Sequence, residues 1–158
     1  MMDDKLPREY AELADTLRRL RTMMGMDVVF VSEFVDDKRT FRYVDARSAD
    51  CPLKAGDAGP LSESFCLRVA DGRLPRLIED VSALPPEQSS DAARSLDIRT
   101  HLSIPIVLHS GKVFGTLCCF SQVNRVDVSD KDRQTLQAMA DFIAAGVDRH
   151  GLFRSSVW

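Results

Sequence analysis

The sequence predicts one α+β domain with a mostly antiparallel sheet and helices on both faces of that sheet. The chain has 158 residues, 44% hydrophobic and 28% charged, which is enough for one core. Strand-like segments come in pairs joined by short polar turns, so they form hairpins rather than βαβ units. An amphipathic helical segment also stands near each end of the chain.

The first expected element is a helix over residues 10–24. Apolar residues recur every three or four positions from Tyr10 to Met24, with polar residues between them. Gly25 is a suitable C-cap. The apolar stripe has the spacing of helices that pack against other helices. Together with the last helix, it predicts a homodimer through the terminal helices.

Two strands follow the first helix. Residues 27–35 are rich in β-branched and aromatic side chains on both faces, which is typical of a central strand covered on both sides. A polar turn over 36–39 leads to a second strand over 40–46. Residues 47–60 contain Pro and Gly and are expected to form a loop.

The middle of the chain has less regular patterning. A short helix is expected to begin at Ser62, as its N-cap, and to end at Gly72. A short strand over 77–78 precedes a long connection over 80–100, which carries a short helix over 92–96. Connections of this length in compact domains are usually functional covers or disordered. We expect this one to cover a site.

The last part of the chain contains the clearest hairpin. Alternating segments over 102–108 and 113–121 flank a turn at Ser110-Gly111. A long amphipathic helix then begins at Ser129, as its N-cap, and ends at Gly151.

Composition excludes several classes of function. Twenty-one Lys and Arg against 24 Asp and Glu give a net charge of −3, which offers nothing to attract nucleic acid or an anionic membrane. No apolar run reaches the roughly 20 residues of a membrane span, and the first residues lack the apolar stretch of a signal peptide. We expect a cytoplasmic protein without nucleic-acid or membrane partners.

Several segments resemble the GAF domain, a small sensory module of bacterial signalling proteins. Residues 103–106, a polar turn and residues 113–120 are similar to the GAF hairpin before the last helix. Residues 25–34 are similar to the first GAF strand, and residues 64–75 to the helix that opens onto the ligand site. The combination is similar to GAF domains attached to cyclic-di-GMP-turnover domains or histidine kinases.

The resemblance implies an arrangement and a role. The terminal helices would cover one sheet face, while the short helix and the long connection would roof a pocket on the other. The domain would span 10–150, between an N-terminal tail over 1–9 and a C-terminal tail over 151–158. It would bind a small molecule without catalysing a reaction. The terminal helices would relay the bound or free state of the domain to a partner, which would be a signalling output domain. The sequence identifies no ligand or cofactor.

The sequence bears on two specialised GAF activities. Cys66 is followed by Leu67, whereas bilin-binding GAF domains commonly have a Cys-His pair, so we do not expect a photoreceptor. The signature of cyclic-nucleotide-binding GAF domains is met only in part, although Arg125 and Asp132 could keep its salt bridge. Cyclic-nucleotide signalling therefore stays open.

Six residues are candidates for ligand contacts in the expected pocket. Glu33 is a carboxylate in an apolar strand and needs a partner, either a ligand or an internal cation. Cys118 and Cys119 point to opposite faces of a strand, and the resemblance assigns Cys118 to the pocket. The complete set is Glu33, Cys66, His101, Ser103, Thr116 and Cys118.

The four cysteines also define the alternatives. They lack metal-ligand spacing, and no catalytic motif is present, so we expect no metal site, no enzyme activity and mostly inert core thiols. One alternative is a cysteine-based redox sensor or a methionine sulfoxide reductase-like enzyme on the same fold. Another is a ligand-free dimerisation module.

Overall fold

The computed structural model describes residues 5–89, 91–124 and 127–153. Within these ranges, one sheet has the strand order β3-β2-β1-β6-β5-β4, and each neighbouring pair is antiparallel. Its strands are β1 (Val28–Val35), β2 (Lys38–Ala46), β3 (Ala58–Pro60), β4 (Leu77–Ile78), β5 (Thr100–Val107) and β6 (Val113–Ser121). The helices are α1 (Lys5–Met24), α2 (Phe65–Ala70), α3 (Asp91–Ser95) and α4 (Asp130–His150), with 3-10 turns η1 (Leu61–Glu63), η2 (Val81–Ala83) and η3 (Pro86–Gln88). The predicted α+β class with an antiparallel sheet is confirmed.

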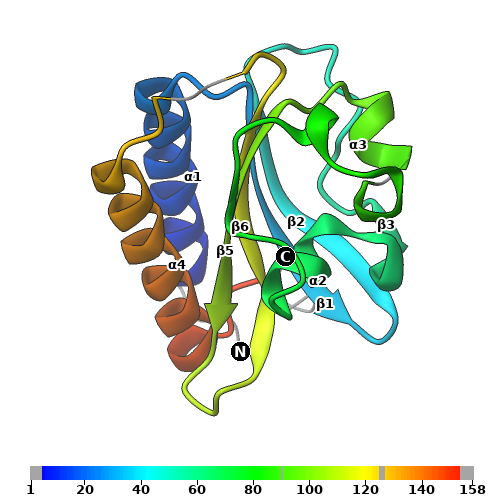
Figure 1. Cartoon of the computed structure of the whole chain (residues 1–158). Coiled ribbons are helices and arrows are strands. Elements are labelled where there is room, and N and C mark those ends of the chain that lie inside the picture. The colour runs from blue at the N-terminus through cyan, green and yellow to red at the C-terminus, as the bar shows by residue number, and fades with distance from the viewer. Residues whose placement is uncertain (1–4, 90, 125–126, 154–158) are drawn as a thin grey trace.

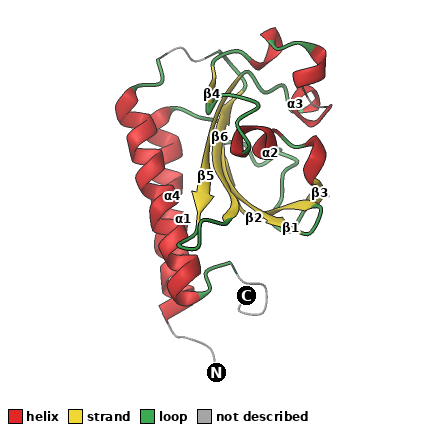
Figure 2. Ribbon diagram, turned by 60° about the horizontal axis from the view of Figure 1, so that its bottom comes forward, coloured by secondary structure: helices red, strands yellow, loops and turns green. Residues whose placement is uncertain are grey.

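Helices cover both faces of the sheet. Figure 1 shows α1 and α4 side by side on one face, and α2 with α3 on the other. Figure 2 shows the same three layers from a different direction. The strands supply alternate residues to the two sides: Val31 and Cys119 belong to the core under α1 and α4, whereas Phe30 and Cys118 belong to the core under α2. The predicted split between Cys118 and Cys119 is confirmed.

The apolar stripes of α1 and α4 pack against the sheet of their own chain. Leu13 and Leu17 of α1 are at most 1% exposed, and Leu136 and Ile143 of α4 are 0% exposed. The homodimer was predicted from these stripes, and this part of the argument was wrong because the sheet already covers them. Self-association therefore stays a prediction that needs other residues.

The ends of α4 match the expected capping residues. The Ser129 side chain accepts a hydrogen bond from the Asp132 backbone N–H, and the Asp132 carboxylate accepts one from the Ser129 N–H. Such a capping box satisfies two donors that a helix start leaves unpaired. Gly151 has φ 68°, the left-handed conformation that ends many helices.

Several boundaries differ from the sequence prediction, and β2 begins at Lys38, inside the polar turn expected over 36–39. The N-cap of α2 is Ser64 rather than Ser62, because the 3-10 turn η1 comes first and the Leu67 N–H donates to Ser64 Oγ. The expected loop over 47–60 contains β3, a three-residue edge strand in which Pro60 is tolerated. Helix α1 begins at Lys5, inside the expected N-terminal tail.

Arg125, residues 1–4 and residues 154–158 lie outside the described residues. The salt bridge expected between Arg125 and Asp132 and the ends of the two expected tails are therefore not described. Within the described ranges, no helix combines the length and the apolar character that crossing a membrane requires.

A one-residue bulge in β2 decides which of its side chains reach the α2 side of the sheet. Val31 pairs with Tyr43, but the next residue of β1, Ser32, pairs with Phe41, so Arg42 has no residue opposite. A bulge of this kind shifts the alternation of the strand by one position. As a result, Arg39 and Phe41 both face the same side as Phe30.

Candidate functional site

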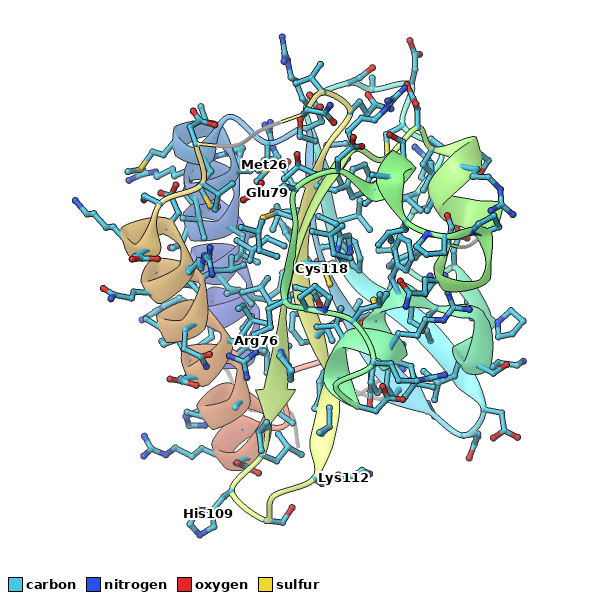
Figure 3. All side chains as sticks on the ribbon, in the orientation of Figure 1. Met26, Arg76, Glu79, His109, Lys112 and Cys118 are labelled. Carbon is cyan, nitrogen blue, oxygen red and sulfur yellow. The ribbon has the colours of Figure 1, made fainter. Side chains whose placement is uncertain are left out.

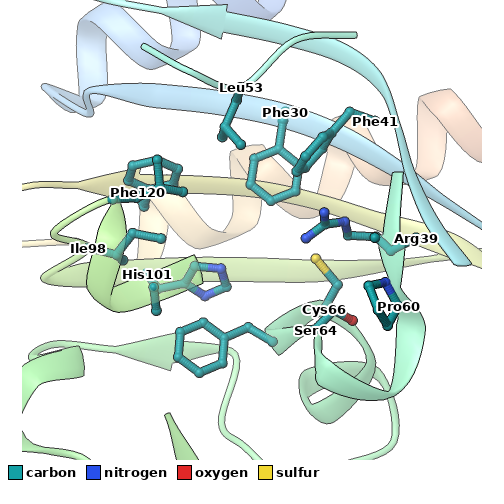
Figure 4. A pocket seen from close by; sticks show the side chains of 14 residues that line it. Phe30, Arg39, Phe41, Leu53, Pro60, Ser64, Cys66, Ile98, His101 and Phe120 are labelled. Carbon is teal, nitrogen blue, oxygen red and sulfur yellow. The ribbon is translucent and has the colours of Figure 1, made fainter. Parts of the chain in front are cut away.

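A cavity of about 210 Å³ lies between the sheet and the layer formed by α2 and α3. This is the sheet face opposite α1 and α4, where the pocket was expected, and the connection over 80–100 supplies part of its wall (Figure 4). The lining residues are Phe30, Arg39, Phe41, Leu53, Gly59, Pro60, Ser64, Phe65, Cys66, Ala93, Leu96, Ile98, His101 and Phe120.

Aromatic side chains make up much of the cavity wall. The rings of Phe30 and Phe41 meet edge to face, with centroids 5.0 Å apart. The ring of Phe65 lies 5.5 Å from that of His101. Edge-to-face contacts of this kind hold rings in fixed positions and leave apolar surface toward the cavity. The walls therefore favour a ligand with a flat or apolar body.

Arg39 brings a permanent positive charge to this apolar cavity. Its guanidinium carbon lies 4.1 Å from the centroid of the Phe41 ring, a cation–π contact. The Nε atom is buried and has no hydrogen-bond partner among the described residues. Gly59 leaves room for the guanidinium, because a Cβ there would lie 3.2 Å from Arg39 Nη2. An unpaired buried donor of this kind is uncommon and favours a ligand that carries an acceptor.

His101 is the second polar group on the wall. Its side chain is 2% exposed, and burial lowers its pKa to about 4. The imidazole is therefore neutral at pH 7, with one ring nitrogen that donates and one that accepts. Its Nδ1 atom is buried and without a hydrogen-bond partner in the described part of the chain.

Ser103, Thr116 and Cys118 lie behind Cys66 rather than on the cavity surface. Cys66 lines the cavity, and its Sγ is 3.8 Å from the Sγ of Cys118. The Sγ of Cys118 lies 3.1 Å from Ser103 Oγ and 3.1 Å from Thr116 Oγ1. The structure thus brings together five of the six predicted candidates, of which Cys66 and His101 reach the cavity wall.

Glu33 lies elsewhere, and its predicted place in the pocket was wrong. It shares a strand face with Val29 and Val31, as expected, but that face lies under α1 and α4. Its carboxylate accepts a hydrogen bond of 2.8 Å from Nε of Arg42, the bulged residue of β2. The alternative of an internal ion pair is therefore the correct one.

Arg39 and the phenylalanines are the site residues that sequence reasoning missed. Arg39 was assigned to a polar turn, although it stands two positions before Phe41 in a strand-like segment. That alternation was the available signal. His109 does not belong to the site: it lies at the turn between β5 and β6, far from Cys118, as Figure 3 shows.

Comparisons with known proteins agree with this architecture. The chain is similar to the crystal structure of the blue-light-absorbing form of the PixJ GAF domain from Thermosynechococcus elongatus, with a TM-score of 0.71 and 14% identity over 99% of this chain and 95% of that one. It is also similar to the GAF domain of a two-component sensor histidine kinase from Bacillus halodurans, with a TM-score of 0.67 and 17% identity over 87% of this chain and 92% of that one. At these identities the likeness concerns the fold.

A sequence relative comes from a larger enzyme. Diguanylate cyclase DgcP of Escherichia coli K12 is 43% identical over 61 residues, which are 39% of this chain and 18% of the enzyme. The matched segment is thus less than a fifth of that protein.

The family itself follows from the sequence. The profile of the family described as GAF domain matches residues 9–148, which is most of the chain. The hairpins, the terminal helices on one sheet face and the cavity on the other are the arrangement that the resemblance implied. This chain belongs to the GAF domain family.

Proposed function

We propose that this domain is a sensory module that binds a small molecule in the cavity between the sheet and α2, without catalysing a reaction. One observation carries the proposal. Two buried side-chain nitrogens, Arg39 Nε and His101 Nδ1, lack partners among the described residues, and both belong to side chains of the same cavity wall. Because buried polar groups in native proteins are nearly always hydrogen-bonded, a ligand that supplies both partners fits this wall.

The wall also suggests the chemical class of the ligand. The Arg39 guanidinium is always charged and pairs best with a carboxylate or a similar anion. The neutral imidazole of His101 suits an uncharged donor or acceptor. Phe30, Phe65 and Phe120 supply the apolar surface between these groups. The ligand is therefore a small, largely aromatic or apolar molecule with an anionic group.

The route from the cavity to the terminal helices runs through the sheet. In β1 and β6, residues of the cavity side alternate with residues of the helix side. Phe120 contributes to the cavity wall, and the neighbouring Cys119 to the core under α1 and α4. A ligand that displaces Phe120 would shift β6, one of the two strands on which α4 packs. The similarity to a diguanylate cyclase favours an output of that kind, which this domain would regulate through its helices.

Benzoate is a suitable probe, with benzyl alcohol as its uncharged counterpart. Binding of each is followed by NMR on the labelled domain, through the Arg39 Nε–H signal and the His101 ring signals. We expect saturable shifts of both with benzoate. Arg39→Gln should weaken benzoate at least about tenfold and benzyl alcohol about twofold or less.

Arg19→Gln is the matched control, because it removes an exposed arginine from the outer surface of α1. It should leave both affinities unchanged. Equal weakening by the two variants would show a nonspecific charge effect. The absence of any shift at Arg39 and His101 with either probe would contradict the proposal and favour a ligand-free module.

A further inference from the structure

Two thiols meet in the wall of the cavity. Cys66 on α2 and Cys118 on β6 are 52 positions apart in the sequence, and their Sγ atoms are 3.8 Å apart. Both side chains are at most 2% exposed. The folded chain therefore holds two cysteines close to bonding distance without joining them, while Cys119, next in the sequence, faces the opposite core.

Hydroxyl groups surround this thiol pair. Cys118 lies within 3.1 Å of the hydroxyls of Ser103 and Thr116, and Thr116 Oγ1 is 2.8 Å from Ser32 Oγ. These side chains are fully buried in a sheet face that is otherwise mostly apolar. These hydroxyls satisfy one another's hydrogen-bonding atoms and hold the Cys118 thiol in place.

The two thiols differ in access and in acidity. Cys66 lines the cavity, on the same wall as the Arg39 guanidinium (Figure 4). Cys118 is not part of the cavity lining and contacts Cys66. A hydrogen bond from Cys118 lowers the pKa of Cys66, against the opposing effect of burial, and the charge of Arg39 lowers it further. Burial raises the pKa of Cys118. Cys66 is therefore the nucleophile of the pair, since the thiolate is the reactive form.

We propose that Cys66 and Cys118 form a thiol–disulfide switch that responds to hydrogen peroxide entering the cavity. In the first step, the Cys66 thiolate attacks one peroxide oxygen, the O–O bond breaks, and the leaving hydroxide takes a proton to become water. Cys66 is then a sulfenic acid. In the second step, the Cys118 sulfur attacks the sulfur of Cys66, and the Cys118 proton passes to the hydroxide that leaves Cys66. The S–O bond breaks, and a second water leaves. Two thiols are oxidised to a disulfide, and one peroxide is reduced to two waters.

Oxidation would change the shape of the cavity. A disulfide brings the two sulfur atoms to about 2.05 Å, so the Cys66 side chain turns away from its present position or α2 moves toward the sheet. Helix α2 has only 6 residues, and Phe65 and Ser64 at its start also line the cavity. The switch thus provides a second input to the same wall. It does not depend on the proposed ligand, because the disulfide forms in the ligand-free domain.

Peptide mapping after peroxide treatment tests the switch. The reduced, folded domain is exposed to hydrogen peroxide, alkylated under denaturing conditions and digested. Before alkylation, the intact protein should lose about 2 Da, the mass of two hydrogens, and the digest should contain a single cross-linked pair, Cys66 with Cys118. Cys51 and Cys119 should not enter a disulfide.

Variants separate the roles of the two thiols. Cys118→Ser should stop the reaction at a Cys66 sulfenic acid, which dimedone captures. Cys66→Ser should slow oxidation of Cys118 at least about tenfold, because the accessible nucleophile is gone. Cys119→Ser is the matched control and should form the same disulfide as the wild type.

Two results would overturn the proposal. One is recovery of both Cys66 and Cys118 as alkylated thiols after a peroxide dose that oxidises the half-buried Cys51. The other is oxidation of Cys118 at the wild-type rate in Cys66→Ser. If a serine variant fails to fold, as judged by circular dichroism, the mapping of the wild-type protein decides alone.

Discussion

Replacing His101 by Met tests whether this imidazole is held neutral in the cavity wall. The folded protein keeps the pKa of His101 at about 4 by burying it, whereas in an unfolded chain a histidine has a pKa of about 6.5. Between these two values the unfolded chain binds a proton that the folded chain does not. The contribution of the buried, neutral His101 to the free energy of unfolding is therefore fully present above about pH 6.5, and it is lost as the pH falls toward 4.

The size of the effect follows from the two pKa values. The difference of about 2.5 pH units, at 1.36 kcal/mol each, amounts to about 3 kcal/mol. That is a large part of the 5–15 kcal/mol that typically holds a domain together, which makes it measurable. Met has a similar bulk and does not titrate. The substitution also removes the Nδ1 atom, which has no hydrogen-bond partner among the described residues. At pH 7 the His101→Met variant should therefore be at least as stable as the wild type.

Urea unfolding followed by circular dichroism measures this difference. We expect the stability of the wild type relative to His101→Met to fall by about 3 kcal/mol as the pH drops from about 7 to about 4. Titrating carboxylates affect both proteins alike and cancel. His109→Gln, which changes an exposed histidine at a turn, should follow the wild type. A difference between wild type and His101→Met that stays constant with pH would refute the reasoning.

Four other predictions concern packing and motion. Gly115→Ala should prevent folding, because the added Cβ would lie 1.8 Å from the Ser32 carbonyl oxygen. In Gly146→Ala the added Cβ meets only the movable Leu152 side chain, so this variant should fold. Thermal melting should show a folding transition for Gly146→Ala and none for Gly115→Ala. Ser129→Ala should cost about 1 kcal/mol in urea unfolding by removing the capping box of α4, and an unchanged midpoint would contradict that role. In sedimentation we expect the wild type to be a dimer, and a monomer at micromolar concentration would reject this prediction. Phe142→Glu should dissociate the dimer and leave the protomer folded, since Phe142 is 52% exposed on α4. Leu17→Glu should unfold the chain, because Leu17 is buried. Benzoate should raise hydrogen-exchange protection in residues 80–100, which supply Ala93, Leu96 and Ile98 to the cavity. Protection confined to α1 and α4 would show that benzoate binds elsewhere.

The sequence predicted most of the fold because its local signals agreed with one another. Alternation in 113–121 separated Cys118 from Cys119, and the two side chains do lie in different cores. Ser129 and Gly151 marked the ends of α4 because capping depends on residues within a few positions. The position of the cavity followed from the resemblance to GAF domains and from the length of the connection over 80–100.

The errors had physical causes that one strand alone does not reveal. Alternation showed that Glu33 shares a face with Val31, but not which layer of helices covers that face. Likewise, the spacing of Leu13 and Leu17 showed an apolar stripe, but a sheet and a second protomer would cover it equally well. Arg39 was missed because its direction depends on the pairing of β2 with β1.

The bulge at Arg42 has a consequence for how such domains diverge. The extra residue is the one that pairs with Glu33: Arg42 lies on the other side of the sheet, while Arg39 and Phe41 face the cavity. Loss of Arg42 would join the pairs on either side of it, Val31 with Tyr43 and Ser32 with Phe41, into one regular ladder in which the remaining side chains of β2 keep their faces. The ion pair with Glu33 and the ligand-facing set of β2 can therefore change separately. Among relatives, we expect this residue to come and go without a change in the cavity wall.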